Sequence, residues 1–154
     1  AMGNIDVTLP IVRRLTAGRV VIVTGNHDRC HPYSKKATGW LERYERLTGA
    51  EVINGNTEIV LRKNSADFGT KVQVSHFPYA GDSYDRGFVD KFAQWRPVDD
   101  GRWLLCGHVH NAYRQNDGVI NVGIDAWGGM PVSEPTLVQH IAAGRRNLPA
   151  IGWV

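Results

Sequence analysis

Three short segments of this 154-residue sequence carry side chains that bind metals or phosphates. Gly25-Asn26-His27-Asp28 places an amide, an imidazole and a carboxylate side by side, and a lone histidine, His76, follows later. Gly107-His108-Val109-His110 supplies two more imidazoles, one residue apart. These groups are ligands for divalent metals and partners for phosphates, although each segment alone is also compatible with a polar turn or a packed histidine. Together they indicate chemistry on a metal, a phosphate or both.

Each segment comes directly after a predicted strand. The β-branched run from Val20 to Val23 predicts a short strand buried on both faces, and the stretches 70–75 and 102–106 predict two more. Open α/β sheets bind ligands beyond the carboxyl ends of their strands, so we expect these groups to converge on one rim. If the segment after Cys106 is extended, His108 and His110 project to the same side.

The remaining pattern is that of an α/β protein. Helices are expected at residues 8–18, where Thr8 is the cap and Pro10 lies early, and at 40–49, 87–95 and 133–143. Further strands are expected at residues 51–53, 57–63 and 119–122. We expect one domain over residues 1–144 and a C-terminal tail at 145–154 that makes few contacts with it.

Composition narrows the class of protein. A hydrophobic content of 42% allows a real core, and the net charge of +3 is a mild basic bias that suits anionic substrates. Cys30 and Cys106 are too few for a disulfide scaffold, which favours inert thiols and a reducing compartment. No apolar run is long enough for a membrane span or a signal peptide, so we expect a soluble cytoplasmic protein with no membrane partner.

The three motifs, in this order, resemble the last three of the five motifs of the calcineurin-like metallophosphoesterases. The stretch INVGIDAWGGMPVS at 120–133 is also similar to the segment after the last motif in small bacterial and phage members. The resemblance covers most of the chain. It implies a two-sheet β-sandwich flanked by helices, with a dinuclear metal centre at the strand ends.

The resemblance also implies roles for individual residues. Asn26, His76 and His108 would bind one divalent ion and His110 the other, with Mn, Fe, Zn, Ni or Mg as the candidate metals. A metal-bound hydroxide would attack the phosphorus of a phosphomonoester or a phosphodiester such as a nucleotide.

Two further residues of the Gly25–Asp28 motif would act beside the metals. By the same resemblance, His27 would lie next to the substrate phosphate and stabilise the transition state or protonate the leaving oxygen. Asp28 would orient His27.

The first two family motifs, Asp-x-His and Gly-Asp, are absent. Residues 1–24 contain one acid, Asp6, and no histidine, so we expect an N-terminally shortened chain that binds metal weakly or binds a single ion. Asp6 is either a substitute bridging ligand or a surface acid. Sheet edges exposed by missing strands would favour self-association or pairing with the missing segment.

Other interpretations stay open. The chain could be a non-catalytic binding or scaffold module that keeps the fold, or, on weaker grounds, a nucleic-acid-processing subunit suggested by a pI near 9.0. No Gly-x-Ser-x-Gly elbow supports a serine nucleophile at Ser75. Residues that could either shape a substrate pocket or simply pack are Tyr79, Tyr84, Arg86, Asn121, Asp125 and Trp127. His31 and His140 are expected to be structural.

Overall fold

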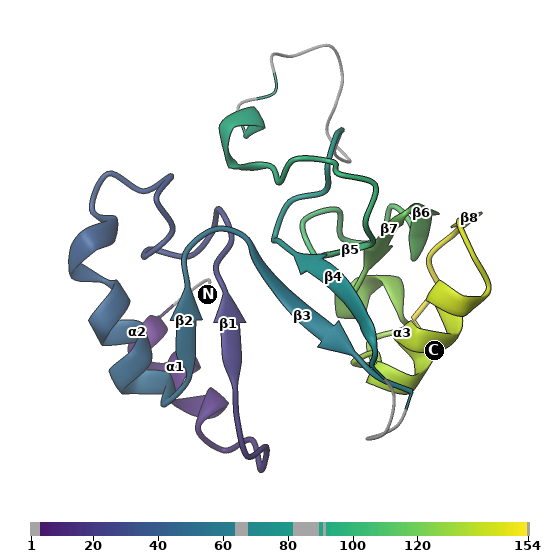
Figure 1. The fold of residues 1–154 in the computed structure, drawn as a ribbon. Coiled ribbons are helices and arrows are strands. Elements are labelled where there is room, and N and C mark those ends of the chain that lie inside the picture. The colour runs from purple at the N-terminus through teal and green to yellow at the C-terminus, as the bar shows by residue number, and fades with distance from the viewer. Residues whose placement is uncertain (1–3, 64–67, 82–89, 91, 154) are drawn as a thin grey trace. The chain divides into compact units, whose positions relative to one another are not determined.

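The computed structural model describes residues 4–63, 68–81, 90 and 92–153. The chain divides into two compact units, residues 1–55 and 56–154, which are drawn in purple to blue and in teal to yellow in Figure 1. The protein is mixed α/β, with a two-stranded sheet in unit 1 and a six-stranded mixed sheet in unit 2. No helix in the described ranges is long and apolar enough to cross a bilayer.

Unit 1 is a parallel pair of strands with two helices. Its elements are α1 (Ile5–Val12), β1 (Val21–Val23), η1 (Ala37–Gly39), α2 (Leu41–Thr48) and β2 (Glu51–Ile53). Helix α1 begins earlier than expected, because the Asn4 side chain rather than Thr8 caps it by accepting from the Asp6 amide at 3.1 Å. Helix α2 and strand β2 are confirmed, and Gly49 ends α2 in the left-handed conformation at φ 69°.

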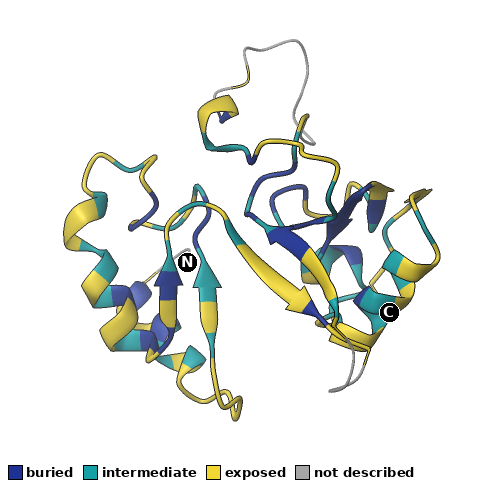
Figure 2. Ribbon diagram, viewed as in Figure 1, coloured by how far each residue is buried: buried dark blue, intermediate teal, exposed yellow. Residues whose placement is uncertain are grey.

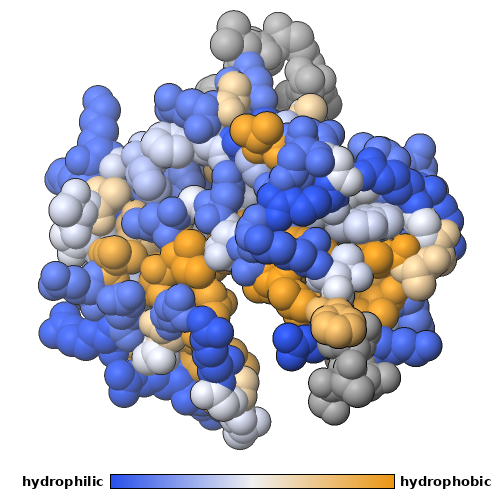
Figure 3. Space-filling model, viewed as in Figure 1, coloured by the Kyte–Doolittle hydropathy of each residue, from blue (hydrophilic) through white to orange (hydrophobic). Residues whose placement is uncertain are grey.

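The helices of unit 1 cover one face of its sheet. Ile22 and Val52 are register partners and pack with Ile5, Leu9 and Tyr44 in one core cluster. The alternate residue Val21 is 39% exposed, and Figure 3 shows apolar side chains gathered over β1 and β2. The expectation that β1 is buried on both faces is therefore wrong within this unit, because only the Ile22 face has helices against it.

Unit 2 is built on a sheet with the strand order β3-β4-β5-β7-β6-β8. The central strands β4, β5 and β7 run parallel, and the flanking pairs are antiparallel. Its elements are β3 (Thr57–Leu61), β4 (Thr70–Val74), η2 (Ala93–Trp95), β5 (Leu104–Cys106), β6 (Gln115–Asp117), β7 (Val119–Asn121), η3 (Ile124–Ala126), α3 (Glu134–Ala142) and β8 (Arg146–Leu148). Of the helix expected at 87–95, only residues 90 and 92–95 are described, and Ala93–Trp95 form a 3-10 turn.

Both faces of the central strands are covered. Leu105 and Ile120 pack towards Leu137 of α3, while Leu104 and Val119 pack on the other face with the Tyr79 and Tyr113 rings. Figure 2 shows the resulting band of buried residues along β5 and β7. Full burial on both faces explains why the sequences of β5 and β7 are mostly apolar rather than alternating. Ser133 caps α3 as predicted.

Two strands were not predicted, and one of them corrects the expected tail. β6 and β7 form a tight hairpin at Asp117-Gly118, and β8 adds to the outer edge of β6. The Ile151 amide then donates to the Ala126 carbonyl at 3.0 Å. Residues 146–148 and 151 are thus held by backbone hydrogen bonds. The expectation that the tail makes few contacts is therefore wrong for these residues.

The packing of Trp153 against Gly129 gives a test of this attachment. Gly129 and Gly144 both have φ near +85°, so alanine at either site should cost about 1–2 kcal/mol of folding free energy from backbone strain. A Cβ at Gly129 would also lie 2.8 Å from the Trp153 ring, whereas nothing lies within 4 Å at Gly144. We expect urea denaturation to show the larger loss for Gly129→Ala. Adding Trp153→Ala should bring its cost down to that of Gly144→Ala, and equal costs without that change would contradict the packing.

Candidate functional site

His76 and His108 come together at the carboxyl ends of β4 and β5. These strands are parallel neighbours, and the Ser75 amide extends their ladder by donating to the Leu105 carbonyl at 3.0 Å. The His108 amide donates to the His76 carbonyl at 2.9 Å, and His108 Nδ1 lies 3.2 Å from His76 Nε2. The predicted convergence of these two side chains is confirmed, and their role as metal ligands stays a prediction.

The His108 ring is held in an aromatic pocket. It is 7% exposed, with its centroid 4.8 Å from that of Phe77 and 5.3 Å from that of Phe92. The two phenyl rings stack on each other at 5.0 Å. Because close-packed rings leave the imidazole few rotamers, the Nδ1 atom of His108 has a fixed direction.

The spacing of the two ring nitrogens suits a shared metal ion. Metal–nitrogen bonds are about 2.0–2.1 Å long, so two ligands of one ion lie about 3.0 Å apart at octahedral angles and about 3.4 Å at tetrahedral ones. The observed 3.2 Å falls between these values, although a hydrogen bond between neutral imidazoles has the same length. Within the described ranges, no group of three or more His, Cys, Asp or Glu side chains is arranged to hold a metal.

His110 does not lie as expected. Residues 108–111 form a turn rather than an extended segment, and His110 takes a left-handed φ of 48°. The cause is Val109, which is buried in the core beside β5 and turns the chain inward between the two histidines. The exposed His110 ring places Nδ1 3.0 Å from Oδ2 of Asp125, a residue that the sequence left ambiguous.

Asn121 sets the shape of this turn. Its side chain is fully buried at the end of β7 and donates to the carbonyls of His110 at 2.5 Å and Tyr113 at 2.8 Å. Its oxygen accepts from the Gly123 amide at 3.0 Å. Asn121 therefore holds together the loop that carries His110 and the loop that leads to Asp125, which is a structural role.

The Gly25–Asp28 motif forms a tight turn at the carboxyl end of β1. The Asp28 amide donates to the Gly25 carbonyl at 2.8 Å, and the Gly25 amide donates back to Asp28 Oδ2 at 2.9 Å. The Tyr44 hydroxyl, whose pKa burial raises to about 12, donates to Asp28 Oδ1 at 3.4 Å. The carboxylate thus stabilises the turn, while His27 is exposed and Asn26 half-buried. The predicted action of Asp28 on His27 stays a prediction.

The two remaining described histidines have structural surroundings. His31 is buried, and its Nδ1 accepts from the Tyr33 amide at 3.1 Å. His140 Nδ1 lies 3.2 Å from Oε1 of Gln115, whose amide group donates to backbone carbonyls. Burial lowers the pKa of both imidazoles, which favours their neutral forms.

The other candidate residues are largely explained by packing. Tyr79 packs against the β5 core and donates its hydroxyl to the Arg102 carbonyl at 3.3 Å, and the Trp127 indole donates to the Asn121 carbonyl at 2.6 Å. Asp6 pairs with Arg43 at 2.5 Å, which joins α1 to α2 as a surface acid does. Tyr84 and Arg86 lie outside the described residues.

Both cysteines are free and buried. Burial raises the pKa of Cys30 to about 11 and that of Cys106 to about 12, so both thiols stay protonated at neutral pH. This agrees with the expectation of inert thiols, because the thiolate is the reactive form.

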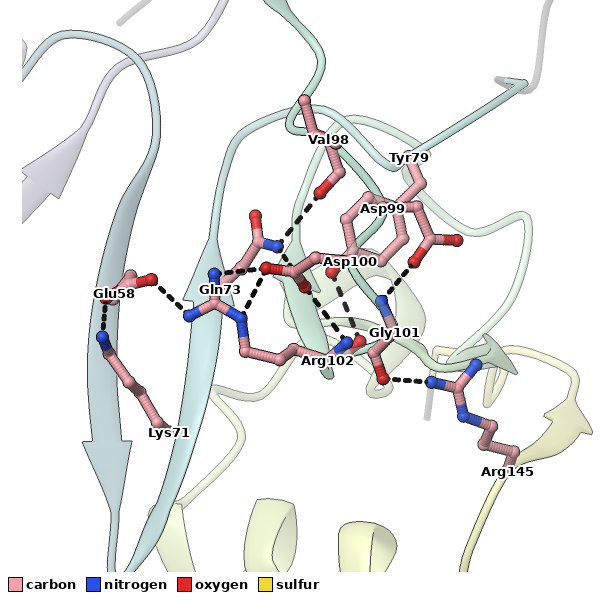
Figure 4. Close-up of polar contacts among 10 residues, drawn as sticks. All are labelled: Glu58, Lys71, Gln73, Tyr79, Val98, Asp99, Asp100, Gly101, Arg102 and Arg145. Carbon is pink, nitrogen blue, oxygen red and sulfur yellow. Dashed lines mark hydrogen bonds and ion pairs between the residues drawn. The ribbon is translucent and has the colours of Figure 1, made fainter.

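A second polar cluster, drawn in Figure 4, joins the β3–β4 hairpin to the loop before β5. Arg102 pairs with Asp100 at 2.5 Å and also with Glu58, which pairs in turn with Lys71. The Arg102 guanidinium holds the pKa of Asp100 well below its usual range. Because Glu58 and Asp100 are paired with cations, their carboxylates tie the hairpin to the loop and are not proton donors.

The fold and the site together define a mixed α/β protein with a histidine pair at the carboxyl ends of two parallel strands of a mixed sheet. The chain is 35% identical over 134 residues to the "Gene 66 protein" of Mycobacterium phage L5, an alignment that covers 80% of this chain and 61% of that protein. It is 38% identical over 115 residues to the "Gene 66 protein" of Mycobacterium phage D29, covering 71% and 54%. The chain therefore spans just over half the length of these relatives, whose names state no activity. No protein-family model and no solved structure matches the chain.

The role of Asn121 predicts a large stability loss on its removal. Asn121→Ala would leave the carbonyls of His110 and Tyr113 and the Gly123 amide without this buried partner, which should cost about 3 kcal/mol in the free energy of unfolding. Urea denaturation measures the loss. Asn116→Ala, at an exposed position of β6, is the matched control and should cost under about 0.5 kcal/mol. Equal losses would count against the role given to Asn121.

The depressed pKa of His140 predicts a pH effect. Above pH ~6.5 the imidazole is neutral in both states, and its contribution to stability is fully present. As the pH falls, the unfolded chain takes up the proton first, so this stability is lost on approach to the lower folded pKa. His140→Gln should remove that part of the loss, which makes the stability of the variant less steep between pH 7 and pH 5. Parallel curves for the two proteins would rule this effect out.

Proposed function

We propose that this protein is a metal-dependent phosphoesterase that resembles the calcineurin-like metallophosphoesterases and hydrolyses a phosphomonoester or a phosphodiester. The observation that carries the proposal is the 3.2 Å separation between His108 Nδ1 and His76 Nε2. Two imidazoles at that distance, at the carboxyl ends of two parallel strands, suit a shared divalent ion. On this proposal the two sheets belong to a β-sandwich flanked by helices.

His76 and His108 would hold the ion, and the protein fixes their geometry beforehand. The Phe77 and Phe92 rings orient the His108 imidazole, and the amide of His108 is bonded to the His76 carbonyl. A bound divalent ion supplies an activated water and neutralises charge on the phosphoryl oxygens. Pre-set ligands lose little side-chain entropy when the ion binds, which favours this pair over flexible surface histidines.

His110 would be a second ligand position, with Asp125 as its positioning residue. The 3.0 Å contact between His110 Nδ1 and Asp125 Oδ2 resembles the carboxylate–histidine pairs that orient metal ligands. In the tautomer with the proton on Nδ1, the Nδ1–H group donates a hydrogen bond to the carboxylate, and Nε2 carries the lone pair. The exposure of His110 leaves this lone pair accessible.

The roles of Asn26 and His27 are assigned by the motif alone. The resemblance gives Asn26 a place among the ligands and His27 the place beside the substrate phosphate. The exposed position of His27 on a tight turn supports that assignment, since a side chain that meets a substrate must be accessible. The turn itself is fixed by Asp28, so His27 is presented from a rigid base.

Hydrolysis of p-nitrophenyl phosphate and its bis ester with added Mn²⁺ tests the proposal. Wild-type chain should release p-nitrophenol, His27→Ala should lower kcat by at least ~100-fold, and His108→Ala should also lose Mn²⁺ binding measured by calorimetry. His140→Gln, a histidine change outside the motifs, should leave both quantities unchanged. The longer L5 relative is a useful parallel sample, because this chain covers 61% of it.

The outcomes separate the interpretations. Absence of hydrolysis in this chain and in the L5 relative, with Mn²⁺ still bound, would overturn the enzyme proposal in favour of a non-catalytic binding module. Loss of Mn²⁺ binding in His140→Gln but not in His108→Ala would contradict the assignment of His108 as a metal ligand, and with it the proposal.

A further inference from the structure

Unit 1 contains a pocket lined by the segment that follows the Gly25–Asp28 turn and by Asn54. Its volume is about 390 Å³, and its lining includes Pro32, Ser34, Lys35, Thr38, Leu41 and Asn54. Asn54 directly follows β2, and its side-chain oxygen accepts from the Thr24 hydroxyl at 2.9 Å. Since β1 and β2 are parallel, the Gly25–Asp28 turn and Asn54 leave the sheet at the same edge. The pocket therefore lies at the edge where open α/β sheets bind ligands.

A regular series of turns connects the motif to the pocket. Backbone amides donate to the carbonyl three residues earlier at Asp28, His31, Ser34, Ala37 and Trp40, with donor–acceptor distances of 2.8–3.1 Å. Each turn shares a residue with the next, so the segment from Gly25 to Trp40 has little independent freedom. The pocket wall therefore continues, turn by turn, from the turn that carries His27.

The polar groups that line the pocket are mainly hydrogen-bond donors. The oxygen of the Asn54 side chain is used by Thr24, so its amide nitrogen is available to donate, and Lys35 offers an ammonium group. The Ser34 oxygen accepts from the Lys36 amide at 3.4 Å, which leaves its proton for another acceptor. No aspartate or glutamate is among the described residues of the lining. Donors without a neighbouring carboxylate favour an anion.

The net positive charge of the chain lies in the same unit. Residues 1–55 contain eight Lys and Arg against five Asp and Glu, whereas residues 56–154 contain ten of each. The whole net charge of +3 therefore belongs to unit 1. A positive unit attracts anionic ligands over distances of about a Debye length, roughly 8–10 Å.

A second cavity among the described residues of unit 1 does not share these features. It has a volume of about 490 Å³ and lies at the opposite edge of the sheet, with Gly18, Arg19 and Glu51 in its lining. Arg19 is paired there with Glu51 at 2.5 Å, and Arg13, also in the lining, donates to the Arg46 carbonyl at 2.8 Å. The lining of this second cavity contains a carboxylate and the cavity lies away from the carboxyl ends of β1 and β2, which favours the smaller pocket as an anion site.

We propose that the pocket formed by Ser34, Lys35, Thr38 and Asn54 binds a second phosphate of the substrate, apart from the phosphate that is hydrolysed. This rests on the proposed function and narrows the substrate class to small molecules that carry at least two phosphate groups. A volume of about 390 Å³ is in the range of small-ligand sites and exceeds the need of one phosphate, so part of the connecting group enters too.

Binding of inorganic pyrophosphate, measured by calorimetry without metal so that nothing is hydrolysed, tests the pocket directly. Lys35→Ala and Asn54→Ala should each weaken binding by roughly tenfold, the loss of one charge-assisted or neutral hydrogen bond. Lys36→Ala is the matched control, because it removes the same charge from a neighbouring residue outside the lining. It should change the affinity less than about twofold.

Kinetics distinguish this proposal from the proposed function. With an active protein, Lys35→Ala should raise KM for a diphosphate-bearing substrate and leave kcat, and all constants for p-nitrophenyl phosphate, unchanged. Equal effects of Lys35→Ala and Lys36→Ala, or no pyrophosphate binding at all, would overturn the pocket even if hydrolysis is found. Selective loss of pyrophosphate binding in a protein that hydrolyses nothing would overturn the proposed function and leave the anion site.

Discussion

The candidate site in unit 2 depends on the parallel pairing of β5 with β4 and β7. Parallel strands end at the same edge, so the residues that follow them meet without any long-range side-chain contact to guide them. The strands are short, and β5 and β7 have three residues each. Their position is therefore secured less by hydrogen bonds than by complete burial on both faces, where Leu104 and Ile120 are inaccessible to solvent. Burial against helix α3 on one face, and against the Tyr79 and Tyr113 rings on the other, fixes the strands that carry the histidines.

Local sequence patterns predicted most of the elements that carry the site. β2, α2 and the Ser133 cap follow from periodicity and capping residues, which act over a few positions. β6 and β8 were missed because Gln115-Asn116-Asp117 and Arg146-Asn147-Leu148 are mostly polar. They form strands because β7 offers an edge and because the buried Gln115 side chain bonds to the carbonyls of Asp117 and Gly144. The Asp117-Gly118 pair was the available hairpin signal.

The histidines show the same division between local and tertiary causes. The meeting of His76 and His108 could be predicted, because it requires only that both follow neighbouring parallel strands. The direction of His110 could not, because it depends on the burial of Val109 and on the hydrogen bond from Asn121 to the His110 carbonyl. Neither contact is visible in the spacing of Gly-His-Val-His. A period of two predicts side-chain direction only while the backbone is extended.

The scarcity of free carboxylates near the histidine pair affects how a metal ion and a phosphate substrate would bind together. His76 and His108 are neutral ligands when they bind a metal, while the nearby carboxylates Asp125 and Asp90 are engaged with His110 and Arg96. A divalent ion at the histidine pair would therefore keep most of its charge, which a phosphate substrate can neutralise. By linkage, the ion and the phosphate would raise each other's affinity by the same factor. On the proposed function, a chain with few carboxylate ligands relies on the anionic substrate to complete its site, and the positive charge of residues 1–55 favours the arrival of that substrate.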